Sequence, residues 1–329
     1  MLMIWVLMLI LSTLLFLILG IISIYFLIQL NFRFNDQYDD EAVIYDEGRP
    51  SWVPQDAFVL DFHCHSSYSD GYLTPAQLVQ WHISNGYDGM VISDHNTMEG
   101  FAEAKEYAES LSTPFLVIPG VEFTSLRVHL NLIGNQTLMP VPKLLWTTKK
   151  TIKRAIEHAK KEDAMVQFNH RDWYPHPWYL SKEWYYERGI DGYEVYNGFD
   201  FVDLEALDFI EAHKHERPLF ASAGTDVHDP ATHLRMYTEV LTEDRTTAGV
   251  IEALKEGRTR VYYDAASEKK RKAPEKGKAK SNPDREKLHE QWKYRLWLGE
   301  GLISGKHRPG IFIFLGLWYL FFLILGILL

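Results

Sequence analysis

The stretch HCHSSYSDG, residues 63–71, determines the fold and the function that this sequence predicts. It follows the apolar run Ala57 to Phe62, which has the length and composition of a buried strand. Because side chains alternate along a strand, His63 and His65 point in the same direction. Asp70 follows in a Ser-Asp-Gly turn that can bring its carboxylate back toward the two imidazoles. The stretch is therefore a candidate divalent metal site, although a His-x-His pair alone also fits two ordinary surface histidines.

The chain beyond this stretch alternates between predicted helices and predicted strands. We expect helices over 74–86, 99–111, 147–162, 203–216 and 247–256, strands over 90–93, 115–118, 164–168, 192–196, 219–223 and 260–263, and a hairpin over 123–133. The first helix begins with Thr74 as its N-cap and Pro75 at its first position. Strands that alternate with helices pair in parallel, so the sequence predicts an α/β architecture.

Histidines and carboxylates recur at the ends of these strands. Beyond the opening stretch they are His95, Glu122, His129, His170, Asp226 and His228. In a barrel of alternating strands and helices, the carboxyl ends of the strands meet on one face, where active sites are built. We therefore expect these side chains to gather with His63, His65 and Asp70 around metal ions. The histidines within predicted helices are interpreted as structural; they are His82, His158, His213 and His215.

The order of the motifs resembles that of the PHP (polymerase and histidinol phosphatase) family. The motifs, between about Phe58 and Tyr263, are H-x-H-S-x-x-S-D-G at 63–71, S-D-H-N-T at 93–97, P-G-V-E at 119–122, N-H at 169–170 and D-x-H at 226–228. This resemblance implies a distorted TIM-like (β/α)7 barrel of the PHP type. It also implies two or three divalent metal ions and the hydrolysis of phosphate esters.

The resemblance further implies how the ions are held. It assigns one ion to His63, His65, Glu122 and Asp226, and a second to Asp70, His95 and Glu122, so that Glu122 bridges the two. His129, His170 and His228 complete the cluster. Asp70 stands where other subgroups carry histidine, which resembles the small phosphatase branch of the family.

The expected chemistry follows from such ions. A water between two divalent ions has a lowered pKa, and the ions neutralise charge that develops on phosphoryl oxygens. A mixed imidazole and carboxylate site suits Zn, Mn or Fe better than Ca. Asp226 and His228 are the candidate catalytic residues of the cluster. Arg171 is the first candidate for a phosphate clamp, because a guanidinium binds phosphate through two hydrogen bonds, and Arg235 is the second.

Two further sets of residues are predicted near the site. The loop after His170 contains aromatic rings that we expect to line the substrate pocket and to stack on a base or ring; they are Trp173, Tyr174, His176 and Trp178. Asp61 and Asp94 are candidates for carboxylates that orient the metal-binding histidines. Strand alternation turns both away from those histidines, so a role in packing or in a turn is the alternative.

The overall composition limits the class of partner. The chain has 329 residues, 47% of them hydrophobic, and a formal net charge of -10. This acidic balance argues against stable binding of duplex nucleic acid, which needs a basic surface. It does not exclude a small phosphorylated substrate such as a nucleotide, because metal ions supply local positive charge. The single cysteine, Cys64, excludes an internal disulfide and is predicted to face away from both histidines.

The two ends of the chain differ from the rest in hydropathy. Met1 to Leu30 and Ile311 to Leu329 are apolar runs long enough for a spanning helix, which needs about 20 residues. The predicted organisation is a transmembrane helix over 1–30, a linker over 31–56, a metallophosphoesterase domain over 57–264, a basic linker with an interfacial segment over 265–309, and a transmembrane helix over 310–329. Basic residues on the domain side of the second span place that domain in the cytoplasm, at the cell membrane, by the positive-inside rule.

Three functions are compatible with these patterns. We favour a membrane-anchored, metal-dependent phosphatase or phosphodiesterase that acts on a phosphorylated substrate. The first alternative is a non-catalytic PHP-like binding module at the membrane, which should have lost several ligands, whereas the whole set is present here. The second is an amidohydrolase-type metal hydrolase, but no lysine stands at an obvious strand end to act as a carbamate bridge between metals.

Overall fold

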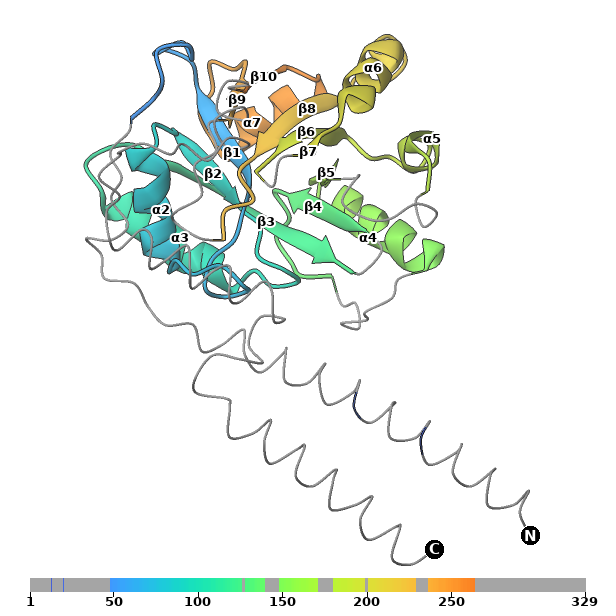
Figure 1. Cartoon of the computed structure of the whole chain (residues 1–329), viewed down its shortest axis with the longest axis horizontal. Coiled ribbons are helices and arrows are strands. Elements are labelled where there is room, and N and C mark those ends of the chain that lie inside the picture. The colour runs from blue at the N-terminus through green and yellow to red at the C-terminus, as the bar shows by residue number, and fades with distance from the viewer. Residues whose placement is uncertain are drawn as a thin grey trace, which may run out of the picture. The chain divides into compact units, whose positions relative to one another are not determined.

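The computed structural model describes residues 48–125, 128–139, 148–170, 180–198, 201–228 and 236–263, together with Thr13 and Gly20 (Figure 1). None of the described helices is long and apolar enough to cross a membrane. The predicted transmembrane segments, 1–30 and 310–329, lie outside the described residues apart from Thr13 and Gly20. The basic linker and interfacial segment over 265–309 also lies outside them, so the predicted domain boundaries stay predictions.

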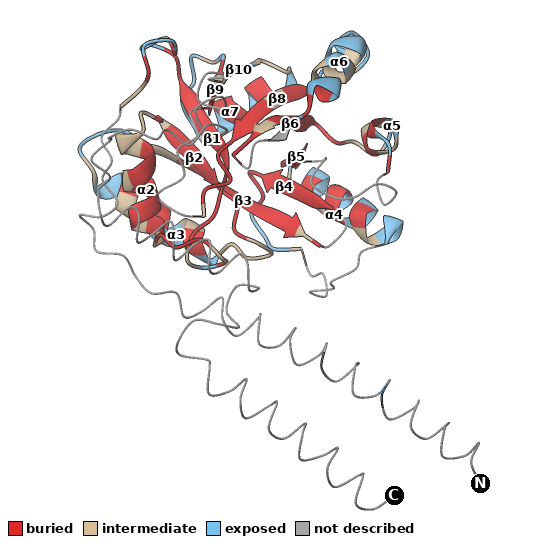
Figure 2. Ribbon diagram, in the orientation of Figure 1, coloured by how far each residue is buried: buried red, intermediate tan, exposed pale blue. Residues whose placement is uncertain are grey.

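The ten described strands form one sheet. They are β1 (Val59–Cys64), β2 (Gly89–Ile92), β3 (Leu116–Thr124), β4 (His129–Ile133), β5 (Met165–Phe168), β6 (Gly192–Asn197), β7 (Phe201–Val202), β8 (Phe220–Gly224), β9 (Met236–Val240) and β10 (Thr259–Tyr263). Their order is β10-β9-β1-β2-β3-β4-β5-β6-β7, and β8 pairs with β6. Most strand residues are buried, whereas the helices outside the sheet expose one face (Figure 2).

The sheet curls until its two halves nearly meet. The chain that follows β8 lies beside β1, where Asp226 N donates to His63 O at 2.7 Å and His65 N donates to Val227 O at 3.1 Å. A parallel bridge joins Cys64 to Val227 at the same place. The result is an α/β, nearly closed barrel in which the ends of β1, β3, β5 and β8 approach one another.

The strand directions differ in part from the predicted parallel barrel. The strands β1, β2 and β3 are parallel, as are β5, β6 and β8, but β4 runs antiparallel between β3 and β5. Only a short connection joins β3 to β4, and such a connection permits a hairpin but not the crossover that a parallel strand needs. The predicted hairpin over 123–133 is therefore confirmed, with β3 reaching further back than expected. The antiparallel strand β9 has no counterpart in the prediction.

The helices begin close to the predicted positions because their caps are explicit in the sequence. They are α2 (Pro75–Ser84), α3 (Glu99–Ser110), α4 (Lys149–Lys161), α5 (Lys182–Tyr186), α6 (Leu204–His213) and α7 (Thr247–Lys255). Thr74 caps α2, and a capping box with Gln77 satisfies two backbone donors. The side chains of Thr148, Asp203 and Thr246 cap α4, α6 and α7.

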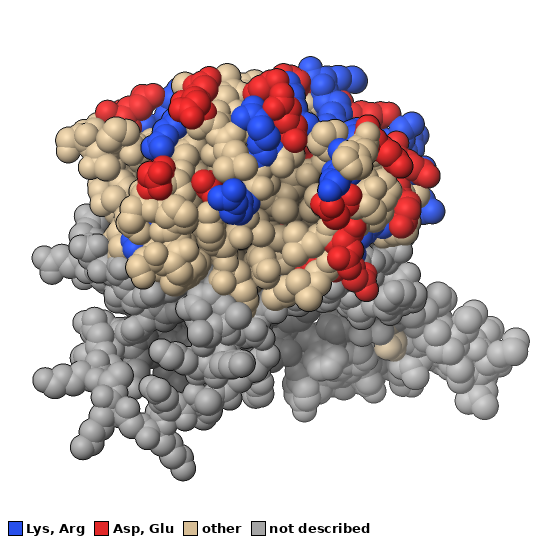
Figure 3. All heavy atoms as spheres, turned by 90° about the horizontal axis from the view of Figure 1, so that it is seen from above, with Lys and Arg blue, Asp and Glu red and all other residues tan. Residues whose placement is uncertain are grey.

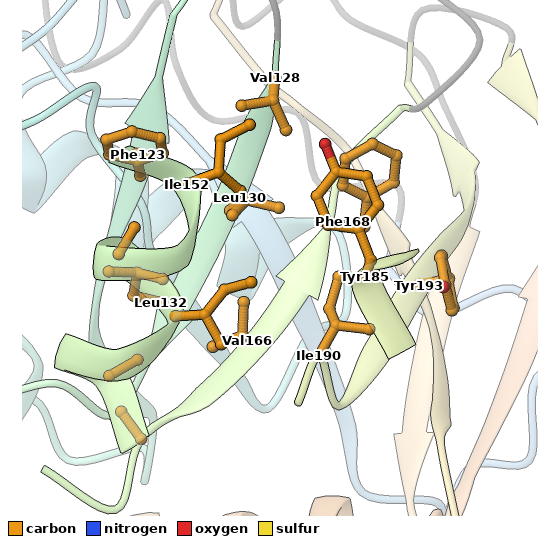
Figure 4. Packing of buried hydrophobic residues seen from close by; sticks show 14 of the residues in the cluster. Phe123, Val128, Leu130, Leu132, Ile152, Val166, Phe168, Tyr185, Ile190 and Tyr193 are labelled. Atoms are coloured by element: carbon orange, nitrogen blue, oxygen red, sulfur yellow. The ribbon is translucent and has the colours of Figure 1, made fainter. Parts of the chain in front are cut away.

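The largest core cluster lies between α4 and the strands β4, β5 and β6 (Figure 4). Ile152 and Ile156 lie four residues apart on one face of α4 and belong to this cluster with Leu130, Leu132 and Val166. Their burial fixes the positions of β4 and β5. The strand β4 begins with His129, and His170 comes two residues after β5 ends, so this packing also positions two predicted metal ligands.

Candidate metal centre

The structure brings all nine predicted ligands together. They fall into groups whose possible ligand atoms lie within 4.8 Å of one another: His65, Asp70, His95 and His228; His63, His65 and Glu122; His63, His170 and Asp226; and His95, Glu122 and His129. These residues come from the ends of different strands and from the turns that follow them. The face at the carboxyl ends of the parallel strands is therefore the candidate metal centre.

The two histidines at the end of β1 form the deepest part of this centre. Both rings are buried, and the Nε2 atoms of His63 and His65 are 3.1 Å apart. His63 Nε2 is also 3.1 Å from Glu122 Oε1, and Asp226 Oδ1 is 3.3 Å from His63 Nε2 and 3.0 Å from His65 Nε2. Two donors bound about 2.1 Å from one ion are roughly 3.0–3.4 Å apart, so these separations fit a shared divalent ion.

Glu122, near the end of β3, lies in the middle of the cluster and is fully buried. Its Oε1 atom is 3.1 Å from His129 Nδ1 and 3.3 Å from His170 Nε2, and its Oε2 atom is 2.6 Å from His95 Nδ1. The two oxygens therefore face different imidazoles. A carboxylate placed in this way can bridge two ions, as the sequence predicts for Glu122.

A tight turn brings Asp70 back to the site. Gly71 N and Ser69 N both donate to Ser66 O, and a Cβ at position 71 would collide with the backbone of His65. Glycine is therefore required there by the close approach of two chain segments. The turn places Asp70 Oδ2 at 3.2 Å from His95 Nε2 and Asp70 Oδ1 at 3.1 Å from His228 Nε2.

One nitrogen of His65 gives an independent indication of a cation. His65 Nδ1 is buried, and it has no hydrogen-bond partner among the described residues, although it lies 3.8 Å from Asp70 Oδ1. An unpaired buried polar atom costs free energy unless something else satisfies it. The convergence of imidazole and carboxylate atoms, together with this nitrogen, fits divalent ions with mixed nitrogen and oxygen ligands.

The carboxylates of the centre are held in their charged form. Burial opposes ionisation, but the neighbouring imidazoles outweigh it and lower the pKa of Glu122, Asp70 and Asp226 well below the usual values. The imidazoles with the largest effect are His129 for Glu122, His228 for Asp70 and His63 for Asp226. These three carboxylates therefore stay ionised at neutral pH and are available as ligands for cations.

The pKa values of the imidazoles differ, although burial affects all of these rings. Burial opposes protonation in each, but Asp70 and Glu122 raise the pKa of His95, and Asp226, Glu194 and Glu122 raise that of His63. Asp70 likewise raises the pKa of His228 to about 9. For His65, burial and the neighbouring imidazolium charges lower the pKa to about 3. Protons and metal ions therefore compete for several of these rings.

Two ligands sit on unusual backbone. Asp226 has φ 51° and His170 has φ 23°, a region that residues other than glycine rarely adopt. The backbone of Asp226 is held by its hydrogen bond to His63 O, and His170 N donates to Glu194 Oε2 at 2.8 Å. Such conformations persist where the surroundings over-determine them, which is common at functional sites.

The structure distinguishes between the two roles considered for Asp61 and Asp94. Asp61 accepts from the backbone nitrogens of His63 and Thr225 and faces His82 Nε2 at 2.8 Å. Asp94 accepts from Ser66 N at 2.7 Å and Ser69 Oγ at 2.7 Å. Both carboxylates hold the backbone and turns around the centre. His82 is structural as predicted, and Cys64 is buried with its thiol facing Val91 O.

Sequence reasoning missed the polar residues that hold the ligands in place. Asn169 Nδ2 donates to Glu122 Oε1 at 2.7 Å, and Thr124 Oγ1 lies 2.6 Å from His95 Nδ1. Glu194 Oε1 lies 2.9 Å from His63 Nδ1. The available signal for Glu194 was an acidic residue in the middle of an otherwise apolar predicted strand, 192–196.

The predicted phosphate clamps and pocket rings cannot be placed in this centre. Arg171 and Arg235 lie outside the described residues, as do the aromatic loop residues Trp173, Tyr174, His176 and Trp178. Their roles stay predictions.

Comparison with known proteins agrees with this fold and centre. The PHP domain family matches residues 61–206, a segment that contains seven of the nine ligands and ends before Asp226 and His228. The resemblance indicated by the order of the motifs is thereby confirmed. Fold, centre and match describe an α/β domain that is similar to the PHP domain over residues 61–206, and its homologues include hydrolases acting on phosphoester bonds.

The similarity to individual curated relatives covers a smaller part of the chain. The chain is 31% identical over 107 residues to a 5'-3' exoribonuclease of Haemophilus influenzae, covering 31% of this chain and 38% of that protein. It is 34% identical over 70 residues to the 5'-3' exoribonuclease Rnm of Escherichia coli, covering 21% of this chain and 24% of the relative.

A solved structure is similar over a longer part of the chain. It is a two-domain protein of Bacteroides vulgatus that contains a predicted PHP-like metal-dependent phosphoesterase, with a TM-score of 0.51 and 26% identity. The similarity covers 63% of this chain and 65% of that one. The chain therefore matches less than two thirds of each of these relatives.

Proposed function

We propose that this protein is a metal-dependent phosphoesterase, and that it cleaves a phosphodiester in a nucleotide or at the end of a single-stranded nucleic acid. The observation that carries the proposal is the buried Glu122, whose two oxygens face different imidazoles of one cluster. The choice of a phosphodiester is supported by the two exoribonuclease relatives. A phosphomonoester is the other substrate of the same chemistry.

The contacts support two or three ion positions. The first would be held by His63, His65, Glu122 and Asp226, the second by Glu122 with His129 and His170, and the third by Asp70, His95 and His228. Among the described residues no ligand group contains both Asp70 and Glu122. Asp70 instead groups with His65, His95 and His228, and we assign it to the third position on that ground. Zn, Mn and Fe all suit this donor set.

Differences in burial indicate where the substrate approaches. The side chains of His63, His65 and Glu122 are 0% exposed, whereas His95 is 21%, Asp70 15% and His228 13% exposed. The substrate phosphate would therefore arrive from the side of Asp70, His95 and His228. Bound divalent ions would lower the pKa of a water and stabilise charge on the phosphoryl oxygens.

The residues of the chain itself supply position and charge. Asp226 lies between His63 and His65 and would place them around one ion, while Glu122 would bridge two ions through its two oxygens. His228 is a partly exposed imidazole at the third position and would orient the phosphate. Arg171 is proposed as the phosphate clamp on the strength of its place directly after His170.

The expected shape of the substrate follows from surface charge. On the face seen in Figure 3, Lys and Arg side chains lie interspersed with Asp and Glu. A duplex would need a continuous basic surface, so we expect a short or single-stranded substrate. The exoribonuclease relatives act on RNA by name, which is weakly in tension with the expectation of no stable duplex nucleic-acid binding; a single-stranded end agrees with both.

Hydrolysis by the full-length chain tests the proposal directly. Phosphomonoesters, nucleoside phosphates and short ribo-oligonucleotides would be compared with Mn²⁺ added, using wild type, His63→Ala and Asp226→Ala. His213→Ala is the matched control, because His213 lies on α6 and hydrogen-bonds to Phe209 O, outside the cluster. We expect both site variants to lose activity and the control to keep it. A wild-type chain that binds ions but cleaves none of these esters would refute the proposal.

A further inference from the structure

Glu194 is a buried carboxylate at the metal centre that the proposed ion positions do not use. It is the third residue of β6, it is 3% exposed, and it is the only charged residue in that strand. Burying a carboxylate is costly unless its oxygens are paired. Both of its oxygens have partners, and each of those partners belongs to or contacts a segment that carries a metal ligand.

The first oxygen faces His63. Glu194 Oε1 is 2.9 Å from His63 Nδ1, and a carboxylate can only accept at that distance. The proton of a neutral His63 ring is therefore held on Nδ1. Its Nε2 lone pair is left free at the atom that lies 3.1 Å from Glu122 Oε1. A hydrogen bond to the remote nitrogen is how proteins set the tautomer and the ring orientation of a metal-binding histidine.

The second oxygen joins two other segments. Glu194 Oε2 accepts from His170 N at 2.8 Å and from Asn197 Nδ2 at 3.0 Å. Asn197 Nδ2 also lies 3.2 Å from Asp226 Oδ2. His170 and Asp226 are the two ligands with positive φ, so Glu194 directly holds one strained residue and reaches the other through Asn197.

Gly224, at the end of β8, makes room for this contact. A Cβ at position 224 would lie less than 3.0 Å from both Glu194 Oε1 and His63 Cβ. Its φ is not positive, so the backbone conformation does not require glycine there. The requirement is for space beside the Glu194–His63 pair.

We propose that Glu194 is a positioning residue of the metal centre, and that Gly224 is kept small to admit it. This inference rests on the proposed function, because it assigns a role toward ions that the nine ligands would hold. In it, Glu194 acts through His63, His170 and Asn197 and does not touch the ion or the substrate. It fixes which nitrogen of His63 binds metal and orients the segments that carry His170 and Asp226.

The first test is the affinity of the full-length chain for Zn²⁺, measured by competition with a chelator. Glu194→Gln should weaken it about 10- to 100-fold, because the amide presents a donor where the carboxylate accepts. Gly224→Ala should weaken it as well, although it leaves the carboxylate intact. Asp191→Asn is the matched control: Asp191 is buried just before β6, accepts from Val166 N at 2.7 Å and pairs with Lys160. We expect it to lower thermal stability without changing zinc affinity.

The second test reads the tautomer itself. In the Zn²⁺-loaded protein, ¹⁵N-histidine spectra should show His63 protonated at Nδ1, and Glu194→Gln should broaden or shift that signal. A His63 proton on Nε2, or zinc affinity of Glu194→Gln within twofold of wild type, would overturn the positioning role alone. A wild-type chain that binds no zinc would instead overturn the metal centre, and the positioning role with it.

Discussion

At the scale of single residues, Glu122 is the carboxylate that faces the most imidazoles of the described centre. Replacing it with Gln removes the negative charge that faces His63, His95 and His129. It also puts an amide NH2, which cannot bind a metal ion, among the metal ligands. We expect Glu122→Gln to lower kcat about 100- to 1000-fold, in line with losses seen when charge stabilisation is removed. It should also reduce the bound metal, measured by elemental analysis. Glu205→Gln, on the exposed face of α6, is the control and should behave as wild type.

The raised pKa values of His63, His95 and His228 predict how metal affinity changes with pH. Without metal these rings carry protons at neutral pH, with the pKa of His228 at about 9, and a protonated imidazole cannot bind an ion. Binding must therefore release protons, so affinity should rise as pH rises. For each proton released, Kd should fall about tenfold per pH unit while that ring is protonated in the metal-free chain, and the contribution of His228 should level off above about pH 9. Chelator competition at several pH values measures this; a flat profile would contradict it.

The residues that the sequence identified differ in kind from those it missed. His63, Glu122 and Asp226 could be found because ligand chemistry limits which side chains qualify and strand ends limit where they stand. Asn169 and Thr124 could not, since amides and hydroxyls are common in loops and their role depends on which neighbour they reach. Their contacts with Glu122 and His95 exist only in three dimensions.

At the scale of elements, α2 is tied to the barrel through a buried pair. His82 Nδ1 is 2.8 Å from Leu78 O, its Nε2 atom is 2.8 Å from Asp61 Oδ2, and Asp61 holds Thr225. Replacing His82 with Phe leaves a buried carboxylate oxygen with one partner fewer. We expect the free energy of unfolding to fall by about 1–3 kcal/mol.

Urea denaturation of the metal-free chain would measure this effect. His213→Phe is the matched control, because His213 is only half-buried on α6 and stacks on Phe209. An equal loss of stability in both variants would indicate that the Asp61 contact contributes nothing particular.

The elements also show where pattern reasoning ends. The helices could be placed closely because caps such as Thr74 and Thr148 are local signals. Whether a strand runs parallel or antiparallel depends on the length of its connection and on its partner, so β4 was visible as part of a hairpin. The strand β9, with the sequence MYTEV, was missed because five residues of mixed polarity carry little signal of their own. Its pairing with β1 joins segments that are remote in the chain.

At the scale of the whole molecule, bound ions should stabilise the fold. Nine ligands from several barrel strands converge, so ions that bind only the folded state shift unfolding by mass action. Saturation with Zn²⁺ at about 100 times Kd should add about 2.7 kcal/mol per site. Thermal scans with Zn²⁺ and with a chelator would show the difference, and identical melting temperatures would count against a structural contribution from the ions.

The two ends of the chain determine the cellular location that we predict. We propose that 1–30 and 310–329 anchor the chain in the cell membrane with the barrel in the cytoplasm, on the hydropathy and charge of those segments alone. Protease added to intact cells should leave the barrel uncut. After the membrane is permeabilised, the protease should cleave the barrel. Cleavage in intact cells would place the barrel outside.

The hydrogen bonds between β1 and the segment after β8 affect the order in which the barrel assembles. Asp61 and Thr225, which join there, are 164 positions apart in the chain. During synthesis, the amino-terminal part emerges with His63, His65, Asp70, His95 and Glu122 long before Asp226 and His228. Contacts this remote close late and slowly. A ribosome-bound nascent chain ending before residue 225 would therefore hold an open barrel that lacks two of the nine ligands, and we expect competence to retain metal to arise only after those two have emerged.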